Sequence, residues 1–469
     1  MPARRHIPTP PRPIMPHTHT KLTISAILAL GAVALSPTLH AQDKATLDLL
    51  VKKNVITQQE ADSLAKGSGD PSIVVGPKDP NVKSLKLEGL IQSQFDWLTT
   101  QDKGAGASNA PAAEQFYVRR AYLGALADLG NGWAGEALFD FATGSKIAGG
   151  YQGGPAGITP QPNFEKIYIS KKIDDASGTV TAGYRKVNFT LEEYTPSTVV
   201  KPVERSILSN YFDGGYKAIG ATATGTRLGF ASRHPGIFWD GTVTNTGFFY
   251  GVAVTNGVQS ATSYTPVGGL NRLAGWAYIG YSGTLGDKTT YKAGINYGYT
   301  PDANTIVTQA NSDWGYNPYV SVVYDKNAQV DAEFIQGFVT NGRGDNAAGT
   351  VTERAAPFGF NVTPSYKITP EWELVARYTY LFTDGRGVNI SDVVTNANDV
   401  AGANIRFNDA QSIYVGVNWN IMGDSVKALF GYEWDEFTHR ATAGSNAASS
   451  LTGPRAVVQG VRARVQLQF

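Results

Sequence analysis

The chain has 469 residues, of which 42% are hydrophobic and 17% are charged, and it contains no cysteine. The absence of cysteine excludes a disulfide framework and thiolate metal sites. The longest apolar stretch, residues 22–35, is shorter than the roughly 20 residues that a membrane-spanning helix needs. The 52 glycines and the 11% aromatic residues instead indicate many strands joined by glycine-rich turns.

Residues 1–41 have the layout of a signal peptide for secretion. Four basic residues and no acidic residue precede or open the apolar stretch, and the small residue Ala41 offers a cleavage point. Cleavage there removes four of the 40 basic residues and none of the 39 acidic ones, which leaves 36 against 39. The mature chain therefore lacks the basic balance of a nucleic-acid-binding protein, and no nucleic acid is expected as a partner.

Residues 42–66 are predicted to form a short helical segment in front of the main domain. Thr57 and Glu60 have the spacing of a capping box, which satisfies free N–H groups where a helix begins. The segment is interpreted either as a periplasmic helical hairpin or as a contact for oligomerisation or for the cell wall. Residues 67–83 are rich in glycine and proline, which is typical of a linker, so the main domain is predicted to span residues 84–469.

The main domain shows hydrophobic residues at every second position. Such a pattern gives a strand one apolar face and one polar face. The runs are about 9–13 residues long, which is the length of a tilted strand that crosses a bilayer and is longer than a strand of a soluble sandwich. The clearest runs lie at residues 85–97, 133–141, 291–297, 372–380, 413–419 and 461–469.

This pattern predicts an all-β protein, a transmembrane antiparallel β-barrel of about 16 strands. Aromatic residues gather at the strand ends, as in the girdles of outer-membrane barrels. About sixteen strands leave a water-filled lumen, where eight would be packed shut. The chain ends on Phe469 after an alternating run, which resembles the C-terminal signal read by the barrel assembly machinery. The expected location is the outer membrane of a Gram-negative cell, in contact with its lipid.

Catalytic chemistry has little material in the mature chain. His234 and His439 are its only histidines, so a serine hydrolase triad or a histidine metal site is not expected. The sequence predicts no catalytic residue, no cofactor and no metal. An outer-membrane barrel hydrolase and a structural protein of the envelope are the less favoured alternatives to a channel.

Several short motifs resemble the phosphate-selective porins O and P, and they follow one another in the order found in that family. The first is an arginine pair in an early strand, at residues 115–123. The others lie at residues 183–192, 204–205, 372–378, 416–419 and 462–469. The resemblance covers nearly all of residues 84–469. It implies a sixteen-stranded trimeric porin with basic side chains at its constriction.

The resemblance also implies which residues line that constriction. Arg119, Arg120 and Tyr122 match the family's constriction strand, and Arg205 matches a further pore arginine. Lys186 is a further candidate because it adds a cation close to the same segment. A guanidinium group offers a fixed fork of donors that fits a phosphate or a carboxylate.

Arg119 and Arg120 are sequence neighbours, so in a regular strand they would point to opposite faces. Both can reach the lumen only where the strand bends, bulges or folds inward. An arginine that faced lipid at mid-depth would cost about 2–4 kcal/mol. The two arginines are interpreted either as attractors of anions or as plain partners in ion pairs, with Glu136 and Asp140 on the next strand as the expected acids.

The chain departs from the family at Glu193, which stands where the phosphate-selective members place a lysine. This change argues against selectivity for phosphate as such, although Lys186 could compensate in part. The predicted function is passive diffusion of small hydrophilic solutes with a preference for anions, phosphate among them. The alternatives are a general non-selective porin and a porin for the uptake of carboxylates or other nutrients.

Overall fold

The structure is a computed structural model. It describes residues 82–102, 113–142, 163–174, 178–213, 231–257, 273–301, 312–340, 354–384, 407–438 and 455–469. The predicted signal peptide, the predicted helical segment at 42–66 and His439 lie outside the described residues. No helix in these ranges is long and apolar enough to cross a membrane.

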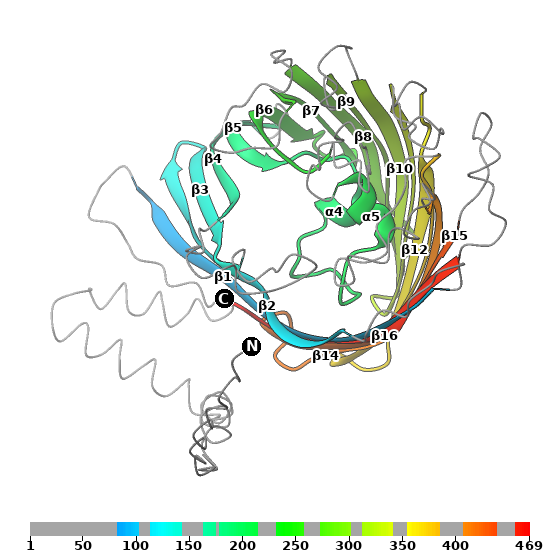
Figure 1. The fold of residues 1–469 in the computed structure, drawn as a ribbon. Helices are drawn as coiled ribbons and strands as arrows, with labels where there is room; N and C mark the ends of the chain where they lie inside the picture. The colour runs from blue at the N-terminus through cyan, green and yellow to red at the C-terminus, as the bar shows by residue number, and fades with distance from the viewer. Residues whose placement is uncertain are drawn as a thin grey trace, which may run out of the picture. The chain divides into compact units, whose positions relative to one another are not determined.

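Sixteen antiparallel strands form one closed barrel in which each strand pairs with its neighbours in sequence, and the first strand pairs with the last (Figure 1). The predicted fold class and strand number are confirmed. The strands are β1 (Ser84–Asp102), β2 (Ala113–Gly130), β3 (Trp133–Asp140), β4 (Asn163–Asp174), β5 (Gly178–Lys186), β6 (Arg233–Thr242), β7 (Phe248–Asn256), β8 (Leu273–Leu285), β9 (Thr289–Pro301), β10 (Ser312–Tyr324), β11 (Ala328–Val339), β12 (Phe358–Lys367), β13 (Trp372–Phe382), β14 (Asp409–Asn420), β15 (Val426–Thr438) and β16 (Arg455–Gln468).

Alternation along each strand separates a lipid-facing exterior from a polar lumen, as the sequence pattern predicts. In β1, Ile91 and Trp97 are exposed on the outside, whereas Gln92, Gln94 and Asp96 are buried on the inside. Trp133, Trp372 and Trp419 at strand ends are also exposed on the outside. Because every backbone group of a closed barrel is paired, such a sheet can lie in lipid without an exposed edge.

The C-terminal residue closes the barrel against its first strand. The backbone N–H of Gly89 donates to the carbonyl of Phe469 at 2.9 Å, and the N–H of Phe469 donates to the carbonyl of Gly89 at 3.1 Å. The Phe469 ring packs over Gly89, where a Cβ would lie 2.2 Å from the ring and would force it to shift. The aromatic end of the chain is thus part of the strand pairing.

One connection folds into the barrel. Residues 187–213, here called the inward segment, follow β5 and contain the short helices α4 (Leu191–Tyr194) and α5 (Ile207–Phe212). Both helices lie inside the ring of strands, with α5 beside β12 (Figure 1). The inward segment therefore narrows a lumen that sixteen strands alone would leave wide.

Candidate functional site: the pore constriction

The inward segment is held to the wall by apolar side chains that pack against glycines and an aromatic side chain of the strands. Phe189 packs edge-on against Trp276, with 6.2 Å between the ring centroids. Leu208 points at Gly359 of β12, where a Cβ would approach its Cδ1 to 2.5 Å. Phe189 and Leu208 are fully buried. The apolar residues of the segment and the glycines of the wall thus fit each other.

A buried arginine of β13 fastens the segment electrostatically. Arg377 Nη1 lies 3.0 Å from Glu192 Oε1 and donates to the carbonyl of Glu204 at 2.7 Å. Its Nη2 lies 3.1 Å from Glu433 Oε1 on β15. The Arg377 side chain is 0% exposed. The fork of one guanidinium therefore joins two points of the inward segment to the barrel wall.

The paired arginines of β2 both face the lumen because the strand bulges at this point. Gln92 of β1 pairs with Arg120 and Ser93 with Val118, which leaves Arg119 as the extra residue. A bulge of this kind re-aims side chains locally. Two neighbouring arginines can both face the lumen only where a strand is irregular, and the bulge at Arg119 is that irregularity.

The partners of this arginine pair differ from those expected. Arg119 Nε lies 2.6 Å from Glu204 Oε1 of the inward segment, and Arg120 donates to the amide oxygen of Gln92 at 2.8 Å. Glu136 instead pairs with Lys166 and accepts from Tyr168, and Asp140 accepts backbone N–H groups. The ion-pairing interpretation named Glu136 and Asp140, but the acid that pairs with Arg119 in the structure is Glu204, 85 residues further along the chain.

Glu204 is shared between two strands. Its Oε1 also lies 2.6 Å from Arg464 Nη2 on β16. Burial alone would raise the pKa of Glu204, but the charges of Arg119 and Arg464 outweigh it and hold that pKa well below its usual range. Glu204 is therefore ionised over the whole physiological range and neutralises part of the positive charge of this wall.

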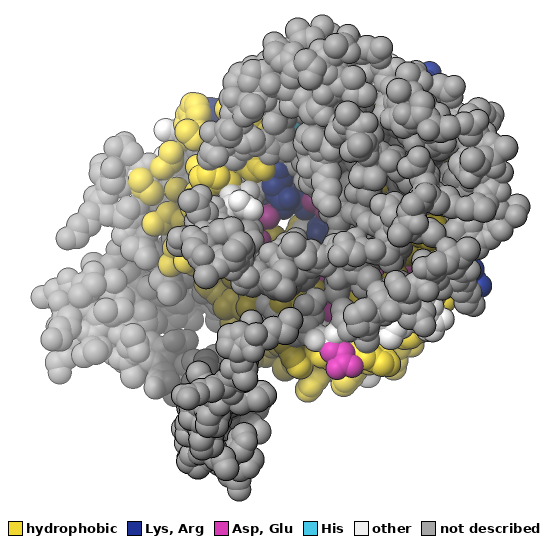
Figure 2. All heavy atoms as spheres, viewed as in Figure 1, with side chains coloured by type: hydrophobic (Ala, Val, Ile, Leu, Met, Phe, Trp, Pro, Cys, Tyr) yellow, Lys and Arg dark blue, Asp and Glu magenta, His cyan; other side chains and the backbone are white. Residues whose placement is uncertain are grey.

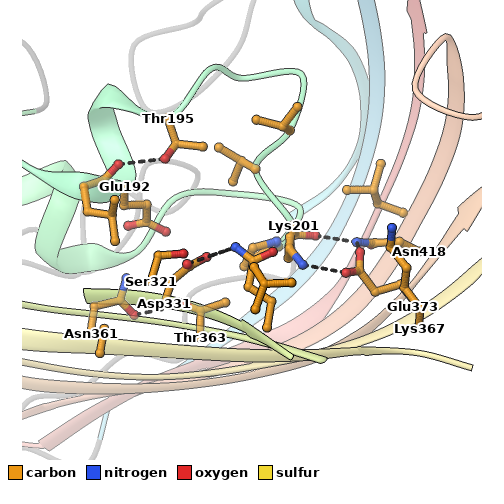
Figure 3. A pocket seen from close by; sticks show the side chains of 18 of the residues that line it. Glu192, Thr195, Lys201, Ser321, Asp331, Asn361, Thr363, Lys367, Glu373 and Asn418 are labelled. Carbon is orange, nitrogen blue, oxygen red and sulfur yellow. Dashed lines mark hydrogen bonds and ion pairs between the residues drawn. The ribbon is translucent and has the colours of Figure 1, made fainter. Parts of the chain in front are cut away.

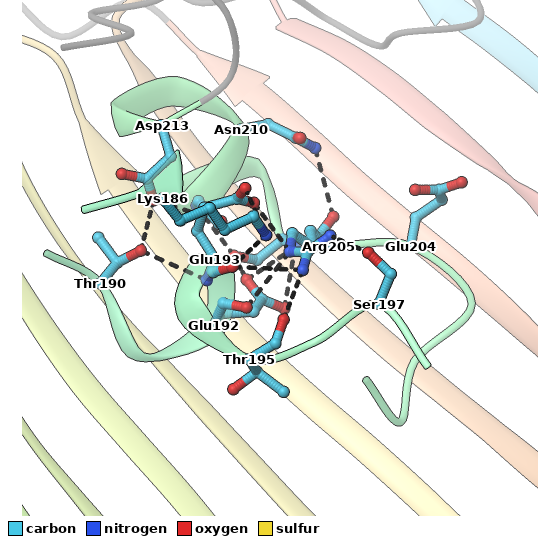
Figure 4. Close-up of polar contacts among 12 residues, drawn as sticks. Lys186, Thr190, Glu192, Glu193, Thr195, Ser197, Glu204, Arg205, Asn210 and Asp213 are labelled. Carbon is cyan, nitrogen blue, oxygen red and sulfur yellow. Dashed lines mark hydrogen bonds and ion pairs between the residues drawn. The ribbon is translucent and has the colours of Figure 1, made fainter. Parts of the chain in front are cut away.

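Lys186 and Arg205 lie together around Glu193 (Figure 4). Glu193 Oε1 lies 2.8 Å from Lys186 Nζ, and its Oε2 lies 2.9 Å from Arg205 Nε. Arg233 of β6 approaches the same carboxylate at 3.8 Å. Burial alone would raise the pKa of Glu193, but the Arg205 and Lys186 charges lower it to about 2. The acid at this family position is thus enclosed by three cations.

Arg205 also organises the turn of the inward segment. Its guanidinium donates to the backbone carbonyls of Glu192, Glu193 and Thr195 and to the hydroxyl of Ser197. With its side chain 8% exposed, it is occupied by protein oxygens. Its position supports a structural part in shaping the constriction.

Asp213 at the end of α5 is a buried acid that accepts the hydroxyl of Thr190. Burial, together with the negative charge of Glu193, raises the pKa of Asp213 well above its usual range. We therefore expect Asp213→Asn to change the free energy of unfolding by less than about 1 kcal/mol, because asparagine keeps an acceptor in place of an already neutral acid. Asp213→Ala should cost about 1–3 kcal/mol, since the Thr190 hydroxyl loses its acceptor.

Thermal unfolding of the two variants in detergent at neutral pH checks this expectation. A loss of stability in Asp213→Asn as large as that in Asp213→Ala would show that the acid is ionised in the folded protein.

Two cavities flank the inward segment. The first, of about 620 Å³, is here called the tyrosine-lined cavity and includes Tyr122, Tyr168, Tyr194 and Tyr319 in its wall. Five basic and two acidic residues line it. They are Lys166, Arg185, Lys186, Arg233 and Lys292, with Glu88 and Glu165. Figure 2 shows lysine and arginine side chains inside the opening of the barrel, next to acidic ones.

The second, of about 510 Å³, is here called the asparagine-lined cavity and lies between the inward segment and β9–β15 (Figure 3). Its five basic residues are matched by five acidic ones. Lys201 of the inward segment, for example, lies 2.6 Å from Glu373, and Asn418 donates to the Lys201 carbonyl at 3.0 Å. Of the two cavities, only the tyrosine-lined cavity has more basic than acidic side chains in its lining.

Tyr122 and Lys186, which the sequence predicts at the constriction, both line the tyrosine-lined cavity. Sequence reasoning missed Glu204, Arg377 and Arg464 as members of the constriction. Arg377 and Arg464 occupy polar positions of alternating strands, which indicates the lumen but not their partners. No local signal connects Glu204 to either of them.

The model of the phosphate-selective porin O and P family matches residues 91–469. The chain belongs to that family. It is therefore an outer-membrane channel, and the closed barrel with a narrowed, polar lumen is the expected form of such a porin. No curated protein sequence matches this porin.

Solved structures resemble the porin in fold. The anion-selective porin from Comamonas acidovorans is 12% identical, with a TM-score of 0.51 over 82% of this chain and 99% of that chain. The outer membrane channel DcaP of Acinetobacter baumannii is 13% identical, with a TM-score of 0.49 over 82% and 97%. The outer-membrane expressed OmpT of Vibrio cholerae is 12% identical, with a TM-score of 0.45 over 84% and 99%.

Proposed function

We propose that this porin lets small hydrophilic solutes diffuse passively across the outer membrane and that it prefers anions. The observation that carries this proposal is that five basic and two acidic side chains line the tyrosine-lined cavity, and that one of the five, Lys292, has no carboxylate partner among the residues that the structure describes. Charges in a narrow, low-dielectric passage are poorly screened and decide which ions enter. We also propose that the porin is a trimer, as its family implies, and that residues 1–41 are a cleaved signal peptide.

Phosphate belongs to this proposal as one of several anions. Glu193 stands where phosphate-selective members have a lysine, but its charge is balanced by Lys186 and Arg205. Of the predicted site residues, Arg119 and Arg205 are engaged with the inward segment, so they shape the passage. Tyr122 and Lys186 line it, and we propose that Lys186 and Arg233 contribute its positive field.

The reversal potential of planar bilayers under a potassium chloride gradient tests the preference. We expect the sign of an anion-selective channel. Arg233→Gln should lower the chloride-to-potassium permeability ratio by about fivefold, because one unit charge at 4 Å in water contributes about 1 kcal/mol. The loss leaves Glu165 and Glu193 less well neutralised.

Lys288→Gln serves as the matched control. It removes the same charge from an exposed turn between β8 and β9, where the lysine side chain is 61% exposed. A cation-selective wild-type channel would exclude the proposed preference. Equal ratios in Arg233→Gln and wild type would show that the field of this cavity does not set selectivity, in favour of a non-selective porin.

A further inference from the structure

The tyrosine-lined cavity is much larger than an inorganic anion. Its volume of about 620 Å³ lies in the range of sites that bind organic molecules. Its four tyrosines come from three walls: β2 and β4 supply Tyr122 and Tyr168, β10 supplies Tyr319, and α4 supplies Tyr194. Tyr194 is exposed over 36% of its surface, so part of its ring is open to the lumen.

Four of the five cations around this cavity already have a carboxylate partner in the protein. Lys166 pairs with Glu136 and Arg185 with Asp240. In the same way, Lys186 pairs with Glu193 and Arg233 with Glu165. Their charges contribute to the field of the cavity, but their donors are partly used by these acids.

Lys292 is different. Among the residues that the structure describes, it has no carboxylate partner, and its Nζ lies 4.8 Å from the centroid of the Phe249 ring. An aromatic face holds a cation without neutralising it. Of the five cations, Lys292 is therefore the one with a full charge to offer to a solute in the described part of the lumen.

The position of Lys292 puts it on the route through the pore. It lines both the tyrosine-lined and the asparagine-lined cavity. Ser321 of β10 stands directly opposite it in register, on the same face of the sheet. Gly294, two residues further along β9, leaves room for Tyr319, because a Cβ there would lie 2.8 Å from the tyrosine Oη. A free ammonium group, a hydroxyl and an aromatic ring thus stand side by side.

We propose that this cavity is a binding site for aromatic monocarboxylates, with the carboxylate at Lys292 and the ring against Tyr319 and Tyr194. One unpaired cation matches one carboxylate, and the tyrosine faces match an apolar ring. Inorganic phosphate needs several free donors around its oxygens, and here most of them are taken. This inference rests on the proposed passage of anions and names the class of solute that the passage retains.

Block of the chloride current by sodium benzoate, sodium acetate and inorganic phosphate tests the inference in planar bilayers. Benzoate should reduce the current at lower concentrations than acetate, which has the same charge but no ring, and at lower concentrations than phosphate. Lys292→Gln should raise the half-blocking concentration of benzoate about tenfold, because a charge-assisted contact is lost. Tyr194→Leu should raise it about threefold, the size of a lost aromatic contact.

Lys288→Gln is again the control, and it should leave the block by benzoate unchanged. Block by phosphate at lower concentrations than by benzoate would overturn the inference, as would the same benzoate block in Lys292→Gln and wild type. If Lys292→Gln fails to assemble, Tyr194→Leu replaces it as the test, because Tyr194 lies in α4 and not in a strand. The same benzoate block in Tyr194→Leu and wild type would then overturn the inference. If the channel is anion-selective but benzoate does not block it, only this inference is wrong. If the reversal potential shows cation selectivity, the proposed function is wrong.

Discussion

Replacing Arg377 with methionine is expected to release the inward segment from the wall and to raise the single-channel conductance. The arginine bonds Glu192 and the Glu204 carbonyl in the segment and Glu433 in β15. Methionine fills a similar volume but leaves the two carboxylates without this partner. Breaking a buried pair by removing one member costs about 3–5 kcal/mol. We expect that cost to appear as weaker docking of the segment, because the strand pairing of the barrel is untouched.

Arg455→Met is the matched control for this change. Arg455 pairs with Glu436 at the far end of β15 and β16, where the arginine side chain is 40% exposed, and an exposed pair contributes little. Conductance in bilayers and thermal unfolding in detergent measure the two effects. Arg377→Lys should restore the docking only in part, since an ammonium group lacks the fork. Wild-type conductance in Arg377→Met would mean that the apolar contacts of the segment suffice to hold it.

The barrel could be predicted from local sequence because its cause is local. Side chains alternate along a strand, so residues such as Ile91 and Gln92 report their face without knowledge of any partner. The arginine pair also predicts a local irregularity of its strand. Arg119 and Arg120 cannot both face the lumen from a regular strand, and the structure resolves this conflict with a bulge.

The constriction could not be predicted in the same way, because its contacts join distant parts of the chain. Glu204 meets Arg119 across 85 residues and Arg464 across 260. Nothing in the neighbourhood of Glu204 in sequence indicates these partners. The docking of the inward segment depends on three-dimensional fit, such as that of Leu208 over Gly359, which joins residues far apart in the sequence.

The same separation in sequence explains why local reasoning offers Glu136 and Asp140 as acids for the arginine pair. They lie on the neighbouring strand, where a regular sheet would bring them close. The inward segment instead delivers a carboxylate from the centre of the lumen. The alternation along a strand therefore indicates that a cation faces the lumen, but it does not indicate which acid pairs with that cation.

This neutralisation leads to the second large effect: Glu204→Gln should make the channel more anion-selective. Glutamine keeps the size of the side chain and its acceptor oxygen but removes the negative charge between Arg119 and Arg464. Both guanidinium groups then present their charge to the lumen. The chloride-to-potassium permeability ratio should rise by about fivefold, because a unit charge at 4 Å in water contributes about 1 kcal/mol.

Protonation of Glu204 by acid should not raise the permeability ratio until the pH is low. The pKa of Glu204 is held well below its usual range, so the stabilisation by its ion pairs is present above the ordinary carboxyl pKa and is lost only as the pH falls through the depressed value. Glu436→Gln, which removes a carboxylate paired outside the constriction, is the control and should leave the ratio unchanged. A ratio that falls in Glu204→Gln would mean that the inward segment had moved and taken its cations with it. Unchanged selectivity would mean that the arginines of β2 and β16 lie off the route of the ions, which would leave Lys292 and the tyrosine-lined wall as the part of the pore that chooses among solutes.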